Sequence, residues 1–122
     1  MVTVRIKRIY DEADGADGCR VLVDRLWPRG VSKEEARIDL WLKDIAPSSG
    51  LRSEFGHVPE RFDAFTQAYR AELDRSADVE QAVELAREHG TLTLLYSAKD
   101  QEHNQAVVLR DYLLERLSGG PG

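Results

Sequence analysis

Three short runs of β-branched and apolar residues, with helical segments between them, constrain the fold of this 122-residue chain most strongly. Residues 3–9 alternate apolar and polar side chains, which is typical of a strand with one exposed face. Residues 20–24 are more continuously apolar, which favours a central strand, and residues 91–96 form a third strand. Strands separated by helices predict an α/β fold: a single small layered domain with a short, mainly parallel sheet flanked by helices. We expect this domain to span residues 1–117 and a flexible tail to follow at residues 118–122.

Helix signals fill the long segment between the second and third predicted strands. A capping box at residues 32–35 predicts a helix that continues through residues 38–45 with its apolar side chains on one face. Pro59 is well placed as the first residue of a further helix, and Asp78 belongs to the N-terminal cap of the next one. Asp100 is the expected cap of the last helix.

The composition is that of an ordinary globular protein and argues against several kinds of partner. The net charge is −5, whereas a general nucleic-acid binder usually has a basic surplus, because phosphate neutralisation supplies most of its affinity. No apolar run approaches the roughly 20 residues of a membrane helix, and the N-terminus has no secretory signal pattern. We therefore expect a cytoplasmic protein without a membrane or nucleic-acid partner. A single cysteine, Cys19, excludes an internal disulfide.

The residues directly after the second strand indicate a binding site. Asp24-Arg25-Leu26-Trp27-Pro28-Arg29-Gly30 places a carboxylate, two guanidiniums and an indole in one short turn. Arg25 and Arg29 can bind a phosphate or carboxylate, Trp27 can stack on a planar ligand, and Asp24 is a candidate catalytic base. The structural alternatives are a surface ion pair for each arginine, a buried loop anchor for Trp27, and hydrogen bonds from loop amides to Asp24.

A second polar group follows the third strand. Tyr96, Ser97 and Lys99 come first, and His103 and Asn104 stand where the last helix begins. Ligands of open parallel sheets bind beyond the carboxyl ends of the strands, so the two loops would form one site if their strands are parallel neighbours. Ser97, Lys99 and Asn104 would then contact the ligand near a helix N-terminus, and Tyr96 would pack against a ring. His103 is a second candidate for proton transfer. Core packing for Tyr96 and solvent exposure for Lys99 are the structural alternatives.

Motifs for metals and common cofactors are absent from the sequence. There is no glycine-rich phosphate loop of the nucleotide-binding types, and His57, His89 and His103 lack metal-ligand spacing. We therefore expect no cofactor and no metal.

Four segments in a fixed order resemble the YeaO-like branch of the domain-of-unknown-function 488 family of uncharacterised bacterial proteins. The segments are Val21 to Gly30, Trp41 to Ser48, Phe55-Gly56-His57, and Leu94 to Asp100 with His103-Asn104. The resemblance covers about residues 2–117 and is far more specific than any one segment. It implies a compact cytoplasmic α/β domain and brings no established activity and no assigned catalytic residues.

These observations predict an anion-binding pocket in an uncharacterised cytoplasmic protein. The first hypothesis is an enzyme that acts on a small phosphorylated or nucleotide-like metabolite, with Asp24 or His103 handling protons. The alternative is a ligand-binding or sensor module without catalysis, because no complete pair of nucleophile and base is visible. A nucleic-acid-binding protein that uses the arginine loop is a third hypothesis, which the net charge of −5 disfavours.

Overall fold

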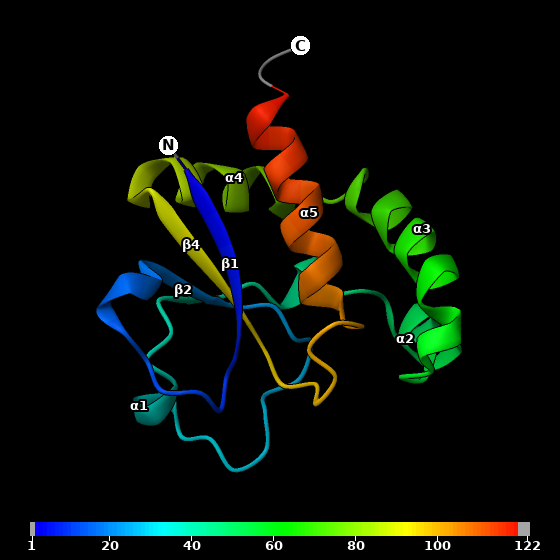
Figure 1. The fold of residues 1–122 in the computed structure, drawn as a ribbon, viewed down its shortest axis with the longest axis horizontal. Coiled ribbons are helices and arrows are strands. Elements are labelled where there is room, and N and C mark those ends of the chain that lie inside the picture. Colours follow the sequence, from blue (N-terminus) through cyan, green and yellow to red (C-terminus); the bar gives the residue numbers. More distant parts are fainter. Residues whose placement is uncertain (1, 120–122) are drawn as a thin grey trace.

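The computed structural model describes residues 2–119, in which a four-stranded sheet has only parallel pairings (Figure 1). The strands are β1 (Thr3–Arg8), β2 (Cys19–Leu22), β3 (Leu40–Trp41) and β4 (Thr91–Tyr96). Their order is β1-β4-β2-β3, so β2 and β4 are parallel neighbours, as one shared site at their carboxyl ends requires. The predicted α/β fold and its parallel sheet are confirmed.

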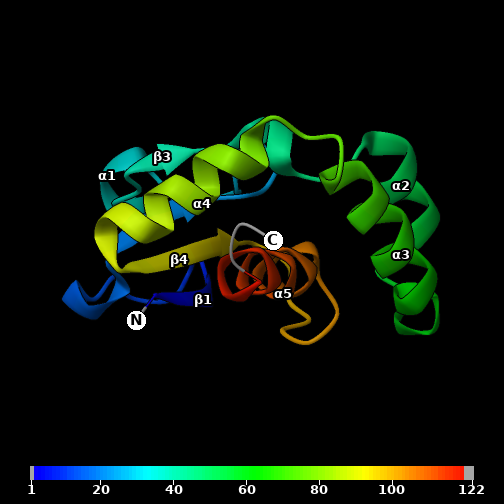
Figure 2. The ribbon, with the colours of Figure 1, turned by 90° about the horizontal axis from the view of Figure 1, so that it is seen from above.

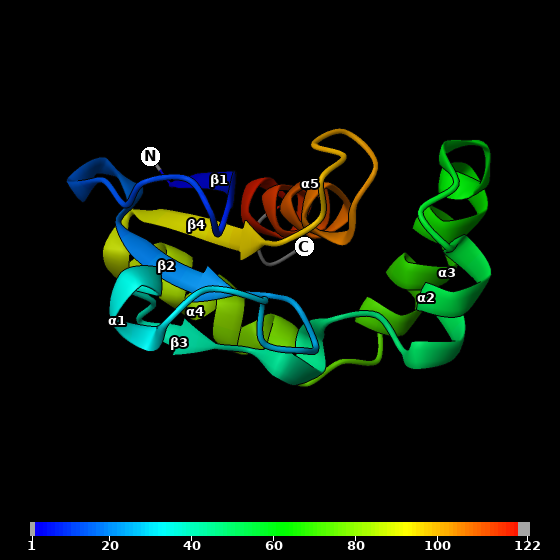
Figure 3. The ribbon, with the colours of Figure 1, turned by 90° about the horizontal axis from the view of Figure 1, so that it is seen from below.

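Helices cover chiefly one face of this sheet. They are α1 (Lys33–Ala36), α2 (Ser49–Phe55), α3 (Phe62–Leu73), α4 (Asp78–His89) and α5 (Gln105–Ser118). Leu92, Leu94 and Tyr96 of β4 point into the main core, which α3, α4 and α5 complete. Leu22 and Leu95 face the opposite side and pack in a smaller cluster with α1. Figures 2 and 3 view the molecule from opposite sides. Helix α4 lies in front of the strands in Figure 2 and behind them in Figure 3.

Helices α2 and α3 lie where the sequence predicts the site. Both helices stand beyond the carboxyl ends of the strands, at one end of the molecule (Figure 2). Contacts between α3 and α5 hold them there, including an Arg70 to Glu115 ion pair of 2.8 Å and a 2.7 Å hydrogen bond from Tyr112 to Asp74. In residues 2–119, no helix is long and apolar enough to cross a membrane.

The helix predicted through residues 38–45 is wrong. The Ser32 capping box does form, but α1 ends after one turn because Arg37 adopts a left-handed backbone with φ of 47°. Leu40 and Trp41 instead form β3, paired with β2. The Trp41 indole donates a 2.7 Å hydrogen bond to the backbone oxygen of Asp24, so sheet pairing and an indole anchor outweigh the helical periodicity.

Two predicted helix caps are also wrong. Asn104, rather than Asp100, caps α5, because its side-chain oxygen accepts from the Val107 amide at 3.1 Å. Asp78 is the first residue of α4 and makes no side-chain cap, and Ala77 occupies the cap position. Helix α5 runs through Ser118, one residue into the predicted tail, and residues 120–122 of that tail lie outside the described residues.

A buried ion cluster supports the sheet on the side of the smaller core. Asp17 is fully buried and lies 2.9 Å from the Lys7 ammonium and 2.5 Å from the Arg20 guanidinium. Its backbone oxygen accepts a 2.6 Å hydrogen bond from Thr93 of β4. Burial by itself raises the pKa of Asp17, but hydrogen bonds from Lys7, the Asp14 amide and Arg20 outweigh it and lower the pKa. The cluster therefore ties β1 and β2 to β4 through charged groups.

We predict that Asp17→Asn lowers the free energy of unfolding by about 3 kcal/mol, because Arg20 would keep a buried charge without its partner. The folded-state pKa of Asp17 lies below the unfolded value of about 3.9, so its contribution is present above that pH and is lost as the pH falls through the folded pKa. Urea titrations across this acid range measure both effects. The exposed Asp63→Asn is the control, and equal losses in the two variants would contradict the prediction.

Candidate functional site

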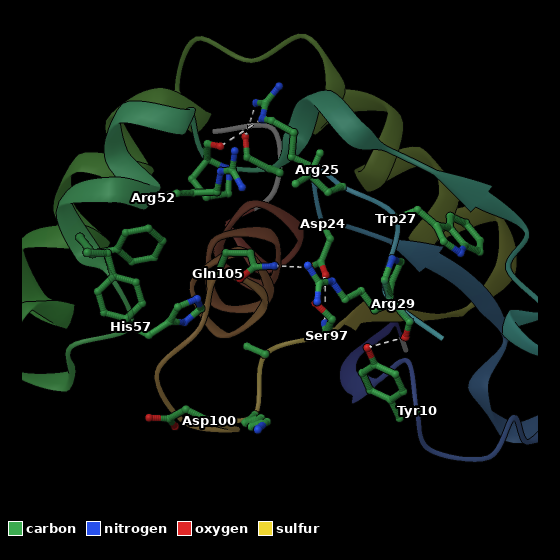
Figure 4. Close-up of a pocket in the computed structure, with 18 residues that line it drawn as sticks. Tyr10, Asp24, Arg25, Trp27, Arg29, Arg52, His57, Ser97, Asp100 and Gln105 are labelled. Carbon is green, nitrogen blue, oxygen red and sulfur yellow. Dashed lines mark hydrogen bonds between the residues drawn. The ribbon is translucent and has the colours of Figure 1, made fainter. Parts of the chain in front are cut away.

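A cavity of about 680 Å³ lies where the sequence predicts the site, at the carboxyl ends of β2 and β4 (Figure 4). Residues 24–29, after β2, form one side, and residues 97–100, after β4, form another. Side chains from α2, from its flanking loops and from α3 close the far side. The structure thus brings the two predicted loops together, as expected for ligand sites of open parallel sheets.

Asp24 joins the segments around this cavity. Its carboxylate is buried and accepts hydrogen bonds from the Ser97 amide at 3.0 Å, the Ser97 hydroxyl at 2.5 Å and the Gln105 side-chain amide at 2.5 Å. Burial raises the pKa of Asp24, and the hydrogen bonds from Ser97 and Gln105, with the charge of Arg52, only partly offset this effect. The carboxylate therefore holds the end of β2, the end of β4 and the start of α5 in one arrangement.

Arg25 fastens the wall of the cavity. Its guanidinium donates hydrogen bonds to the backbone oxygens of Ala46 at 3.0 Å and Pro47 at 3.3 Å, and it lies 3.7 Å from the Asp44 carboxylate. These contacts use two of its five N–H groups, so Arg25 both positions the loop at residues 46–47 and adds positive charge to the cavity.

Three further cations line the cavity and have few partners of their own. In residues 2–119, the side chains of Arg29 and Lys99 are exposed and make no hydrogen bond or ion pair within the protein. Arg52 is half-buried on α2, and its Nε atom is buried without a hydrogen-bond partner. A buried donor without a partner is uncommon in proteins and is costly unless a ligand or water satisfies it.

Arg52 was missed by the sequence reasoning. It lies in a short segment with no strand beside it, and only the fold brings α2 to the carboxyl edge of the sheet. The one local signal was Ser48, which caps α2 by accepting from the Leu51 amide at 3.3 Å. Gln105 was also missed, although it directly follows the predicted residue Asn104 at the start of α5.

Trp27 lies at the cavity wall as an anchored residue. Its indole N–H donates a 2.7 Å hydrogen bond to the backbone oxygen of Val31, and its ring meets Trp41 edge to face with centroids 5.5 Å apart. These contacts fix the loop against the smaller core. Trp27 thus serves as a loop anchor, which was the alternative to stacking on a planar ligand.

Three of the predicted site residues do not line the cavity. Tyr96 is buried in the main core, and Asn104 is the buried cap of α5. His103 pairs its Nδ1 with the Asp100 carboxylate at 2.9 Å and packs its ring edge against Phe62, with centroids 5.2 Å apart. The cavity therefore gathers the remaining predicted residues, namely Asp24, Arg25, Trp27, Arg29, Ser97 and Lys99.

An aromatic wall on the far side was also missed. Phe55 of α2 and Phe65 of α3 stack with ring centroids 4.6 Å apart, and the His57 ring lies 6.0 Å from Phe55. His57 is exposed and has a φ of 59°, directly after Gly56 with a φ of 53°. A histidine in the left-handed region carries backbone strain, which often marks functional positions. Phe55 and Phe65 are also buried in the main core, so the exposed His57 ring is the part of this wall that a ligand can reach most readily.

No metal site is apparent in the part of the chain that the structure describes. No group of three or more His, Cys, Asp or Glu side chains there is arranged to hold a metal ion.

The Asp24 contacts predict an ordered series of stabilities. Asp24→Ala leaves the Ser97 and Gln105 donors without an acceptor and should lower the free energy of unfolding by about 2 kcal/mol. Asp24→Asn should cost less, because the asparagine oxygen can accept from Ser97 while the Gln105 amide rotates to accept from its nitrogen. Urea denaturation at neutral pH measures both values. Equal losses in the two variants would contradict the proposed network.

Comparisons with known proteins agree with the resemblance seen in the sequence. A family model described as "Inactive DUF488-N3 subclade" matches residues 3–120. The "Uncharacterized protein YeaO" of Escherichia coli (strain K12) is 42% identical over 113 residues, which cover 92% of this chain and 97% of that protein. The "Uncharacterized protein Rv3073c" of Mycobacterium tuberculosis is 40% identical over 110 residues, which cover 90% of this chain and 92% of that protein. No solved structure matches the chain. The chain belongs to the YeaO-like branch of the domain-of-unknown-function 488 family.

Proposed function

We propose that this protein is a non-catalytic module of the bacterial cytoplasm that binds a small anionic ligand in the cavity at the carboxyl ends of β2 and β4. One observation carries the proposal: the cations of the cavity keep unused donors, whereas its carboxylates are occupied. The Arg29 and Lys99 side chains make no hydrogen bond or ion pair within residues 2–119, and the buried Nε of Arg52 has no hydrogen-bond partner.

The carboxylates of the cavity do not cancel this positive charge. Asp24 and Asp100 are the two carboxylates among the described residues that line the cavity beside Arg25, Arg29, Arg52 and Lys99, and Asp44, outside the lining, pairs with Arg25 alone. Asp24 accepts three hydrogen bonds from its own protein. Asp100 accepts from the backbone amides of Glu102 and His103, each at 2.9 Å, and contacts the His103 ring. An incoming anion therefore meets available donors and no unsatisfied acceptor charge.

The same contacts favour binding over catalysis. A general base needs a free lone pair that faces the substrate, and three hydrogen bonds hold the Asp24 carboxylate within the protein. The other candidate for proton transfer, His103, is held by Asp100 and does not line the cavity. The Ser97 hydroxyl donates its hydrogen bond to Asp24, at 2.5 Å. The matching family model describes an inactive subclade, which supports the same choice.

A thermal-shift screen against inorganic phosphate, sugar phosphates and small carboxylates, at constant ionic strength, tests the proposal. A ligand at about 100 times its dissociation constant should raise stability by about 2.7 kcal/mol. The double variant Arg29→Gln, Lys99→Gln should lose this effect and keep its fold, because both side chains are exposed and make no hydrogen bond or ion pair within residues 2–119. Stabilisation by no anion at all would contradict anion binding.

A second double variant, Arg75→Gln with Arg87→Gln, is the matched control. It removes the same charge from exposed positions that do not line the cavity and should bind like the wild type. Equal loss of binding in both double variants would indicate non-specific attraction and contradict the site. Mass spectrometry of the ligand after incubation with excess protein should show it unchanged, and conversion to a product would restore the enzyme hypothesis.

A further inference from the structure

We propose that the ligand of this cavity is a nucleoside monophosphate, bound with its base against the aromatic wall and its phosphate among the cations. The inference rests on the proposed anion-binding function and adds the chemical class of the ligand. Four features of the cavity carry it: its size, its division into an aromatic and a cationic side, the position of Arg52, and an orientation imposed on Gln105.

The size of the cavity exceeds what an anion alone requires. Its volume of about 680 Å³ lies within the range of roughly 300–1,000 Å³ that is usual for sites of drug-sized ligands. A phosphate ion or a short carboxylic acid would leave most of this space to water. The ligand therefore carries a substantial body besides its charged group.

The two sides of the cavity differ in chemistry. The exposed, strained His57, with the buried Phe55 of α2 and Phe65 of α3 behind it, forms one side, whereas Arg29 and Lys99 come from the loops at the sheet edge. In Figure 4, His57 lies near α2, and the Arg29 side chain extends from the opposite side toward Asp24. A ligand that spans the cavity thus has a flat apolar part at one end and an anionic part at the other.

Arg52 links the two sides. It stands three residues before Phe55 on α2, so both side chains lie on the same helix face. Arg52, whose Nε is buried without a hydrogen-bond partner, and Phe55 both line the cavity. A cation beside a ring surface suits a ligand whose charge and ring are joined by a short spacer, as a ribose joins a phosphate to a base.

Gln105 adds a polar contact between these two sides. The Asp24 carboxylate is ionised above its pKa and can then only accept, so the Gln105 amide turns its Nε2 toward Asp24, at 2.5 Å. Gln105 lines the cavity, and its side-chain oxygen accepts no hydrogen bond within residues 2–119, so it remains available as an acceptor. Ribose hydroxyls and base N–H groups are the matching donors.

Isothermal titration calorimetry with AMP, GMP, CMP and UMP tests the inference against two matched fragments. Ribose 5-phosphate lacks the base, and the corresponding nucleoside lacks the phosphate. Stacking on aromatic side chains supplies roughly 5- to 150-fold in affinity, so the best nucleotide should bind at least about 10 times more tightly than ribose 5-phosphate. Equal affinity for ribose 5-phosphate would overturn the inference and leave anion binding intact. A nucleoside that binds as tightly as its nucleotide would overturn the proposed function itself.

The variant His57→Gly tests the aromatic wall without disturbing the core. Glycine tolerates the φ of 59° at this position, so the backbone keeps its course while the ring is lost. The preference for nucleotide over ribose 5-phosphate should fall by at least about threefold, and ribose 5-phosphate itself should bind as before. His89→Ala, at an exposed position at the end of α4, is the control. An unchanged preference in His57→Gly, or tighter binding of single-stranded oligonucleotides than of mononucleotides, would overturn the inference.

Discussion

The Asp24 carboxylate joins three segments that are far apart in the sequence. It receives two hydrogen bonds from Ser97 and one from Gln105, so the end of β2, the end of β4 and the first residue of α5 share one acceptor. A buried carboxylate is costly unless donors surround it, and this requirement fixes the relative positions of the two loops. The cavity depends on that arrangement, because one loop supplies Arg29 and the other supplies Lys99.

Helices α2 and α3 supply the side chains that lie opposite this sheet edge across the cavity. Contacts of α3 with α5 hold the α2–α3 pair beyond the strands, and this pair presents Arg52 and the aromatic wall to the two loops. Positive charge therefore surrounds a space that is partly apolar. The polar groups of the cavity have two roles. Asp24, Ser97 and Gln105 bond to one another and hold the site together, whereas Arg29, Arg52 and Lys99 keep donors that a ligand can use.

Much of this could be predicted from local patterns, and the rest depends on tertiary contacts. The runs at residues 3–9, 20–24 and 91–96 predicted the three main strands, and their parallel pairing placed the two loops together. Periodicity failed at Leu40–Trp41, where pairing with β2 and the bond from the Trp41 indole to Asp24 outweigh helix preference. Arg52 could not be found from its neighbours, since only the fold brings α2 to the sheet edge. Three predicted residues near the second loop do not face the cavity. Tyr96 packs in the core, His103 pairs with Asp100, and Asn104 caps α5.

The cations at this sheet edge that lack partners form, we propose, a specific anion site. A titration of the ¹⁵N-labelled protein with inorganic phosphate at constant ionic strength, followed by NMR, tests it most directly. We predict saturable shifts confined to the backbone amides of Arg29 and Lys99 and to the side-chain Nε–H of Arg52. Shifts that do not saturate, or that are equally large at Arg75 and Arg87 away from the cavity, would contradict it.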